Sequence, residues 1–191
     1  MKKGRLEAFS DGVLAIIITI MVLELKVPHN GDFEALKPLL PVFLSYLGSF
    51  VYLAIYWNNH HHLMQIVTNV NGKILWANLN LLFWLSLFPF VTGWMGENSF
   101  GKNPVALYGI VLLLAAIAFK ILVYNIIKSE GKGSIAEKSI GKDRKGSISI
   151  LMYIIGVLIS FKYPIVSIGL YILVAIIWLI PDSRIEKKLK E

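Results

Sequence analysis

Long uninterrupted apolar runs decide the fold class of this chain. The first, VLAIIITIMVL at 13–23, follows the polar segment RLEAFSDG at 5–12. A helix needs roughly 20 apolar residues to cross a hydrocarbon core of about 30 Å, and several runs approach or exceed that length. With 56% hydrophobic and 16% charged residues and a mean hydropathy of +0.66, the chain carries more apolar surface than a soluble domain can bury. The sequence therefore predicts an all-α integral membrane protein, because helices satisfy their own backbone polar groups in lipid.

Polar residues divide the apolar sequence into six predicted transmembrane helices. We expect them at about residues 5–27, 37–60, 72–95, 104–128, 147–161 and 164–180. The intervening segment 129–146 is basic and rich in glycine and serine, so it is expected to form a cytoplasmic loop. Proline and a charge at 161–164 favour a tight reversal between the last two helices. We interpret residues 1–191 as one transmembrane domain, and expect the first run to be retained because no small-residue cleavage site follows it.

The basic residues predict the orientation. With six spans both termini share one side, and that side holds fourteen of the 19 Lys and Arg residues: Lys2, Lys3, Arg5, Lys73, Lys128, Lys132, Lys138, Lys142, Arg144, Lys145, Arg184, Lys187, Lys188 and Lys190. The opposite side holds four, and Lys120 lies within a span. The positive-inside rule therefore places both termini in the cytoplasm. The formal net charge of +7 reflects this topology and does not indicate nucleic-acid binding.

Asp11 stands where the first apolar run begins. An ionisable group there is costly in lipid and usually faces protein or water. It could cap the helix together with Ser10, while Arg5 reaches lipid phosphates. Alternatively, these three residues form a polar cluster with other helices at the cytoplasmic end. Candidate partners lie in the second and third spans: Asn58, Asn59, His60, His61, His62, Asn78 and Asn80.

Three short motifs do not support the sites they resemble. Consecutive histidines at 60–62 point about 100° apart on a helix and have no Cys, Asp or Glu nearby, so a transition-metal site is disfavoured. At least one of these imidazoles is instead expected to hydrogen-bond to the polar cluster. Gly141-Lys142 lacks the flanking residues of a phosphate-binding loop. The segment VTGWMG at 91–96 differs in order from a potassium-channel carbonyl filter, and we expect a turn there, where the third span ends.

One face of the first span is a candidate for an ion pathway. At 100° per residue, Ile16, Ile20 and Leu23 lie within about 60° of one another, with Thr19 and Gly12 beside them. Nearly every residue of this span is apolar, so periodicity alone does not distinguish this face from the others.

A resemblance to a known family rests on residues in the first half of the chain. The first group is Arg5-x-x-x-Phe9-Ser10-Asp11, Gly12-Val13-Leu14-Ala15-Ile16, Thr19, Leu23, Glu24 and Pro28. The second group is Trp57-Asn58-Asn59-His60-His61, Leu75-Trp76-Ala77-Asn78-Leu79 and Pro89. Together they are similar to the signature of the endosomal and lysosomal type of potassium channel, which animals and prokaryotes share. The second half of the chain resembles that family only in span count and hydropathy.

The resemblance implies a subunit of six helices that assembles as a homotetramer around an axial pore lined by the first helix. Ile16 would then form a hydrophobic constriction, followed outward by Thr19, Ile20 and Leu23. The signature cluster, Arg5, Phe9, Ser10 and Asp11, would hold the base of that helix, with Asn59, His60, His61 and Asn78 as its partners. Glu24 could concentrate cations at the outer mouth.

We therefore expect a passive, potassium-preferring cation channel of a prokaryotic cell membrane. It would have no enzymatic activity, no cofactor and no bound transition metal, and its partners would be copies of itself, the lipid bilayer and monovalent cations. One alternative is a proton-linked secondary transporter that uses Asp11 and a histidine. Transporters usually place polar groups near the membrane midplane, where this chain has almost no ionisable residues apart from Lys120. A membrane metalloenzyme is a further alternative, which the missing metal ligands disfavour.

Overall fold

A computed structural model describes residues 3–131, 133–140 and 143–179, and every regular segment within them is helical. The predicted all-α class is therefore confirmed for this part of the chain. Outside it lie the end of the last predicted helix, at residue 180, and seven of the basic residues that predict the orientation, namely Lys2, Lys132, Lys142, Arg184, Lys187, Lys188 and Lys190.

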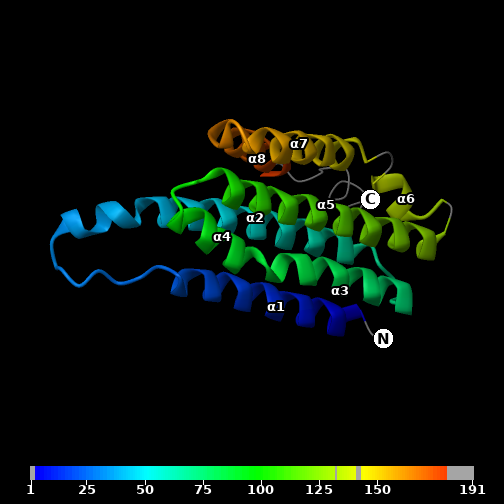
Figure 1. Cartoon of the computed structure of the whole chain (residues 1–191). Helices are drawn as coiled ribbons and strands as arrows, with labels where there is room; N and C mark the ends of the chain where they lie inside the picture. Colours follow the sequence, from blue (N-terminus) through cyan, green and yellow to red (C-terminus); the bar gives the residue numbers. More distant parts are fainter. Residues whose placement is uncertain (1–2, 132, 141–142, 180–191) are drawn as a thin grey trace.

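The helices follow one another with short connections (Figure 1). Their bounds are α1 Lys3–Leu23, the 3-10 helix η1 Phe33–Leu39, α2 Leu40–Gln65, α3 Gly72–Ser86, α4 Phe88–Glu97, α5 Lys102–Glu130, α6 Ile135–Ile140, α7 Arg144–Ser160 and α8 Pro164–Leu179. By length and composition, four helical segments of the described residues can cross a membrane: α1, η1 with α2, α3 with α4, and α5. The apolar helix α8 is shorter, at 16 residues, and α7 has 17.

The third apolar segment is two helices, not one. Leu87 separates α3 from α4, and Pro89 stands in the first turn of α4, where its missing N–H costs no helical hydrogen bond. The turn expected at 91–96 is wrong, since this segment lies inside α4. The chain turns later, where Ser99 and Phe100 have φ values of 48° and 59°. Two glycines of this segment, Gly93 and Gly96, are buried contacts of α4 with neighbouring segments.

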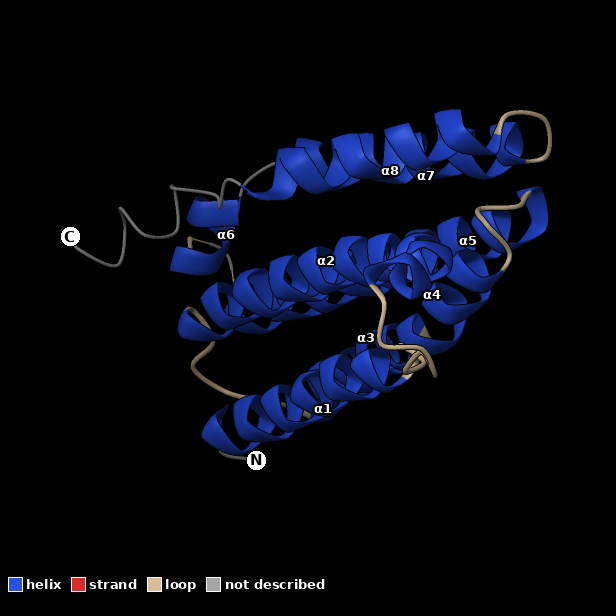
Figure 2. Cartoon of the chain, turned by 90° about the vertical axis from the view of Figure 1, so that its left-hand side faces the viewer, coloured by secondary structure: helices blue, strands red, loops and turns tan. Residues whose placement is uncertain are grey.

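The bundle has α1 at one edge and the α7–α8 pair at the opposite edge, with α2 to α5 between them (Figures 1 and 2). At one end the Lys3 ammonium donates to the Gln65 carbonyl at 3.3 Å. At the same end the Thr68 hydroxyl donates to the Glu130 carboxylate at 2.8 Å. These contacts bring the start of α1, the end of α2 and the end of α5 together, and we call this end the base. The α1–α2 connection, with η1, projects beyond the opposite end (Figure 1).

Candidate functional site

The first helix has one buried and one uncovered face. Its buried residues are Leu6, Ser10, Leu14, Ile17 and Met21. They repeat every three or four positions, as expected for a helix packed on one side, and α1 packs there against α2, α3 and α4. The opposite face has no covering segment within the described chain.

All four residues of the predicted ion pathway lie on the uncovered face of α1. Ile16 is 58% exposed, Ile20 42% and Leu23 78%, whereas Ile17, next to Ile16, is only 4% exposed. Thr19 is also exposed, and its hydroxyl donates to the Ile16 carbonyl at 2.9 Å. That bond uses the hydroxyl proton within the helix, so the oxygen lone pairs remain available to accept a hydrogen bond or face a cation.

A chain of buried polar side chains holds the inner face of α1 near the base. Ser10 is fully buried and donates to the Leu6 carbonyl at 2.9 Å. The Asn78 side-chain amide nitrogen, on α3, donates to the Ser10 hydroxyl at 2.9 Å. The Asn78 side-chain oxygen lies 2.8 Å from His60 Nε2, on α2. This chain therefore links three helices, and places Ser10, Asn78 and His60 of the predicted cluster in contact.

Asp11 lies outside that buried chain. Its carboxylate accepts a hydrogen bond of 3.0 Å from the indole nitrogen of Trp57, on α2. The ring of His61 stacks on Trp57 with centroids 6.1 Å apart, and His61 also lies within 3.0 Å of the Gln65 amide. Sequence reasoning missed Trp57 as the partner of Asp11, because an indole near a span end is usually explained by the headgroup region.

Other predicted members of the cluster are not joined to it within this chain. The Asn59 amide donates to the Ile55 carbonyl of its own helix at 2.8 Å. Phe9 and Arg5 are exposed, and the described residues give Arg5 no hydrogen-bond or ion-pair partner. Both lie on the same side of α1 as Ile16, so a contact for them would come from outside the subunit. Within the described residues, no group of three His, Cys, Asp or Glu side chains could hold a metal ion.

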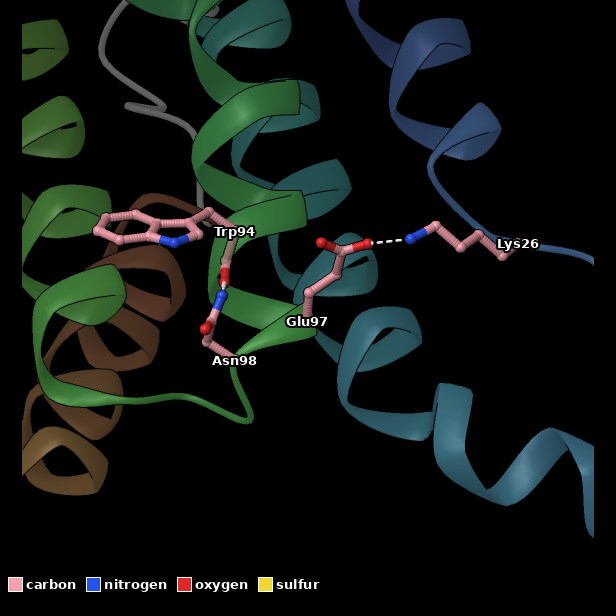
Figure 3. A network of polar contacts seen from close by, with 4 residues as sticks. All are labelled: Lys26, Trp94, Glu97 and Asn98. Atoms are coloured by element: carbon pink, nitrogen blue, oxygen red, sulfur yellow. Dashed lines mark hydrogen bonds and ion pairs between the residues drawn. The ribbon is translucent and has the colours of Figure 1, made fainter.

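The outer end of α1 is tied to α4 (Figure 3). The Lys26 ammonium and the Glu97 carboxylate form an ion pair of 2.5 Å. The hydrogen bond from Lys26 to Glu97, together with their opposite charges, raises the pKa of Lys26 above its usual value. Glu24 rests against Gly93, where a Cβ would lie 3.5 Å from the Glu24 carboxylate. Glu24 is therefore turned toward α4 and away from the uncovered face.

The sequence model of the family described as "Endosomal/lysosomal potassium channel TMEM175" matches residues 5–89, which include α1 and the Ser10–Asn78–His60 chain. A potassium channel of Chryseobacterium sp. (strain P1-3) is 61% identical over 191 residues, covering all of both chains. The human endosomal/lysosomal proton channel TMEM175 is 39% identical over 116 residues, 54% of this chain and 23% of the human protein.

A similar fold is known from a crystal structure. It is that of a lysosomal potassium-selective channel TMEM175 homolog from Chamaesiphon minutus, with a TM-score of 0.81 and 28% sequence identity. The match covers 95% of this chain and 98% of the other. The structural likeness therefore extends past α4 into the second half of the chain, beyond the residues that the family model matches.

Proposed function

The chain belongs to the TMEM175 family, and from that premise we propose that it conducts potassium passively through a pore lined by α1 of several identical subunits. It is a potassium channel, and its family is a channel family with no enzymatic chemistry. The observation that carries the proposed pathway is the uncovered stripe of Ile16, Ile20 and Leu23, with Thr19 beside it.

The subunit is proposed to cross the membrane six times and to assemble as a homotetramer. Four long helical segments and the shorter α7–α8 pair provide the six crossings. A single first helix cannot enclose a pore, so neighbouring copies must complete it. The stripe on α1 then faces the axis, while the hydrogen-bonded chain at Ser10 fixes the helix from behind.

The membrane is proposed to be the cell membrane of a prokaryote, with the base of the bundle and both termini on the cytoplasmic side. Among the described residues, Lys3, Arg5, Lys73 and Lys128 lie at or near the base, as the positive-inside rule requires. Ions from the cytoplasm would thus meet Phe9 and then Ile16 before they reach Leu23 and the outer mouth.

The chemistry of this stripe differs from that of a carbonyl filter. An isoleucine side chain cannot replace the hydration shell of an ion, so Ile16 acts by narrowness and by excluding water, and discriminates modestly between cations. Thr19, one turn outward, offers an oxygen beside the apolar neck. Selectivity for potassium is therefore assigned to the ring of Ile16 and Thr19 side chains together.

Ion flux from proteoliposomes tests the proposal. Vesicles containing the purified protein and loaded with potassium should release it down its gradient when a proton carrier supplies the balancing charge, and more slowly when sodium replaces potassium. Because the human relative is named a proton channel, a pH-sensitive dye without that carrier should measure proton flux separately. Flux that required a coupled counter-ion would overturn the channel and favour the proton-linked transporter.

A further inference from the structure

At the base, the α7–α8 pair stops short of the end of α5, the helix on which it packs. In α7, Ser147 accepts a hydrogen bond of 3.0 Å from the Lys120 ammonium of α5. Ten residues, about 15 Å, separate Lys120 from the end of α5, whereas three residues, about 4.5 Å, separate Ser147 from the start of α7. Helix α5 therefore continues toward the base for about 10 Å beyond the start of α7. Figure 1 shows α5 extending past α7 at this end. The Trp178 indole, near the end of α8, donates to Ser149 at 2.8 Å, so α8 also stops short of the end of α5.

An open recess lies at this step. It has a volume of about 430 Å³ and is lined by Lys120, Asp143, Arg144, Ser147 and Ile148. Asp143 contributes a negative charge, but one of its carboxylate oxygens accepts the Gly146 amide at 2.7 Å and caps α7. The partial positive charge at the N-terminus of α7 therefore offsets part of the negative charge of Asp143. Lys120 and Arg144 are both exposed and each contributes a positive charge, against the one negative charge of Asp143. The side chains that line the recess therefore have a net positive charge.

The recess opens onto an apolar surface. Ile148, Leu151, Ile155 and Leu158 are large and exposed along α7, as expected for a lipid-facing helix. At 17 residues, α7 is about 25 Å long, which is shorter than a hydrocarbon core of about 30 Å. Lipid headgroups next to α7 must therefore approach its ends closely, because the bilayer thins around a short helix. With α7 crossing the membrane as proposed above, phosphates are expected at the level of Lys120 and Arg144.

A smaller cavity adjoins the recess and shares Lys120 and Asp143 with it. It has a volume of about 40 Å³ between α2, α5, α7 and α8, and its walls include Tyr56, Phe119, Tyr153 and Trp178. A water molecule needs about 10–15 Å³ by the same measure, so the cavity has room for roughly three waters. We therefore assign the acyl chains of a lipid at the recess to the outer surface of α7.

We propose that the recess binds the phosphate of an anionic membrane phospholipid, held by Lys120 and Arg144, with the acyl chains along Ile148 and Leu151. Ser147 keeps the Lys120 ammonium at the mouth of the recess, and its own hydroxyl donates to the Asp143 carbonyl at 3.0 Å. Basic pockets between transmembrane helices on the cytoplasmic side are suited to anionic headgroups. The site lies at the edge of the subunit opposite α1, so it does not depend on which helix lines the pore, but it rests on the proposed membrane crossing of α7 and on the proposed cytoplasmic side of the base.

Native mass spectrometry of the full-length protein tests this site. The protein is titrated with dioleoylphosphatidylglycerol, and with dioleoylphosphatidylcholine as the lipid without net charge. The wild type should bind the anionic lipid more tightly. Each basic residue near a membrane surface contributes about 1 kcal/mol, so Lys120→Gln or Arg144→Gln should weaken that binding about fivefold, and the double variant about 25-fold. Binding of the phosphatidylcholine should not change.

Lys128→Gln is the matched control. It removes the same charge from α5, but Lys128 lies over the Tyr124 ring, 5.8 Å from its centroid, and outside the recess. Equal losses in Lys128→Gln and the two recess variants would overturn the proposal, as would equal wild-type binding of both lipids. Displacement of the anionic lipid by millimolar inorganic phosphate would also overturn it, in favour of a site for free anions.

One further variant and a check of assembly keep the test decisive. Lys120→Arg retains the charge and should retain lipid binding, so its failure would count against the assignment. If Lys120→Gln fails to assemble, as judged by its elution volume, Arg144→Gln carries the test alone, because Arg144 is exposed at the start of α7.

Discussion

Ile16 and Ile17 are adjacent in sequence and opposite in environment, with 58% and 4% of their surfaces exposed in the subunit. If copies of Ile16 meet on the pore axis, Ile16→Asn replaces a dry neck with one lined by amides. Water then enters more readily, so single-channel conductance should rise and the ratio of potassium to sodium permeability should change, while Ile16→Val should alter both less. Single-channel currents and reversal potentials measure these effects.

The neighbouring substitution Ile17→Asn is the control for that experiment. It places an amide in a buried helix contact, so it should reduce the yield of folded protein and leave the permeability ratio unchanged. If Ile16→Asn assembles normally and changes neither conductance nor selectivity, then Ile16 is not at the constriction.

Asn78 is the central member of the buried polar chain, bonded on one side to Ser10 and on the other to His60. Asn78→Ala leaves both partners buried without that bond, which should lower the free energy of unfolding by about 1–3 kcal/mol. Asn80→Ala, on the same helix but exposed, should change it by less than about 0.5 kcal/mol. Thermal unfolding in detergent compares the two variants. Similar losses at both positions would show that the chain does not stabilise the base.

The polar cluster shows how far reasoning from sequence reaches for individual side chains. The cost of a polar group in lipid predicts that Ser10, Asn78 and His60 need partners, and they do bond to one another. That rule does not identify the partner of Asp11. The Trp57 ring is apolar apart from one N–H, which can donate a hydrogen bond either to a lipid headgroup or to a carboxylate. The choice depends on how α1 and α2 pack, which hydropathy does not encode.

Helix α4 approaches α2 closely at Gly96. A Cβ at Gly96 would lie 2.5 Å from the Ser45 hydroxyl and 2.6 Å from the Val42 Cα. Because a backbone atom cannot move aside, Gly96→Ala should lower the unfolding free energy by about 1–3 kcal/mol through overpacking. Gly93→Ala, one turn earlier, meets only the end of the Glu24 side chain at 3.5 Å, and should be tolerated. Unfolding midpoints of the two variants test this difference, which equal midpoints would contradict.

The break between α3 and α4 is a feature that hydropathy does not predict. An apolar window continues without interruption through Leu87, Phe88 and Pro89, so it predicts one long helix. Proline in the first turn of a new helix is as apolar as proline in a kink, and only the backbone distinguishes the two. Similarly, the expected end of the third span predicts a turn at 91–96, whereas small residues such as Gly93 and Gly96 in an apolar segment also allow helices to pack closely.

The subunit leaves a stripe of large apolar side chains uncovered on α1, and a second, broader set on α7 and α8 at the opposite edge. The first set is assigned to the pore axis and the second to lipid. Hydropathy predicts that such surfaces exist but does not separate them, because lipid and a protein neighbour accept the same side chains. The resemblance of residues 5–89 to the channel family is what distinguishes the two surfaces before the structure is considered.

Disulfide cross-linking tests the proposed assembly, and the chain contains no cysteine that would interfere. A disulfide forms where two Cα atoms approach to about 4.4–6.8 Å, a separation expected for neighbouring helices only at the narrowest point of the pore. Oxidation of Ile16→Cys in membranes should therefore give covalent dimers on non-reducing gels. Because each subunit carries one thiol, the product should stop at the dimer even within a tetramer. Ile17→Cys should give none, since its side chain is buried within its own subunit.

Val22→Cys separates axial position from simple exposure. Val22 is 44% exposed, comparable with the residues of the stripe, but it lies about 120° from Ile16 around the helix. It should therefore remain monomeric under the same oxidation, although a water-soluble thiol reagent or a lipid-phase one can still label it. Dimers from Val22→Cys without dimers from Ile16→Cys would show that Val22, and not Ile16, faces the pore axis. The assignment of Thr19, Ile20 and Leu23 to the ion pathway would then fail as well, because all three lie on the same face as Ile16.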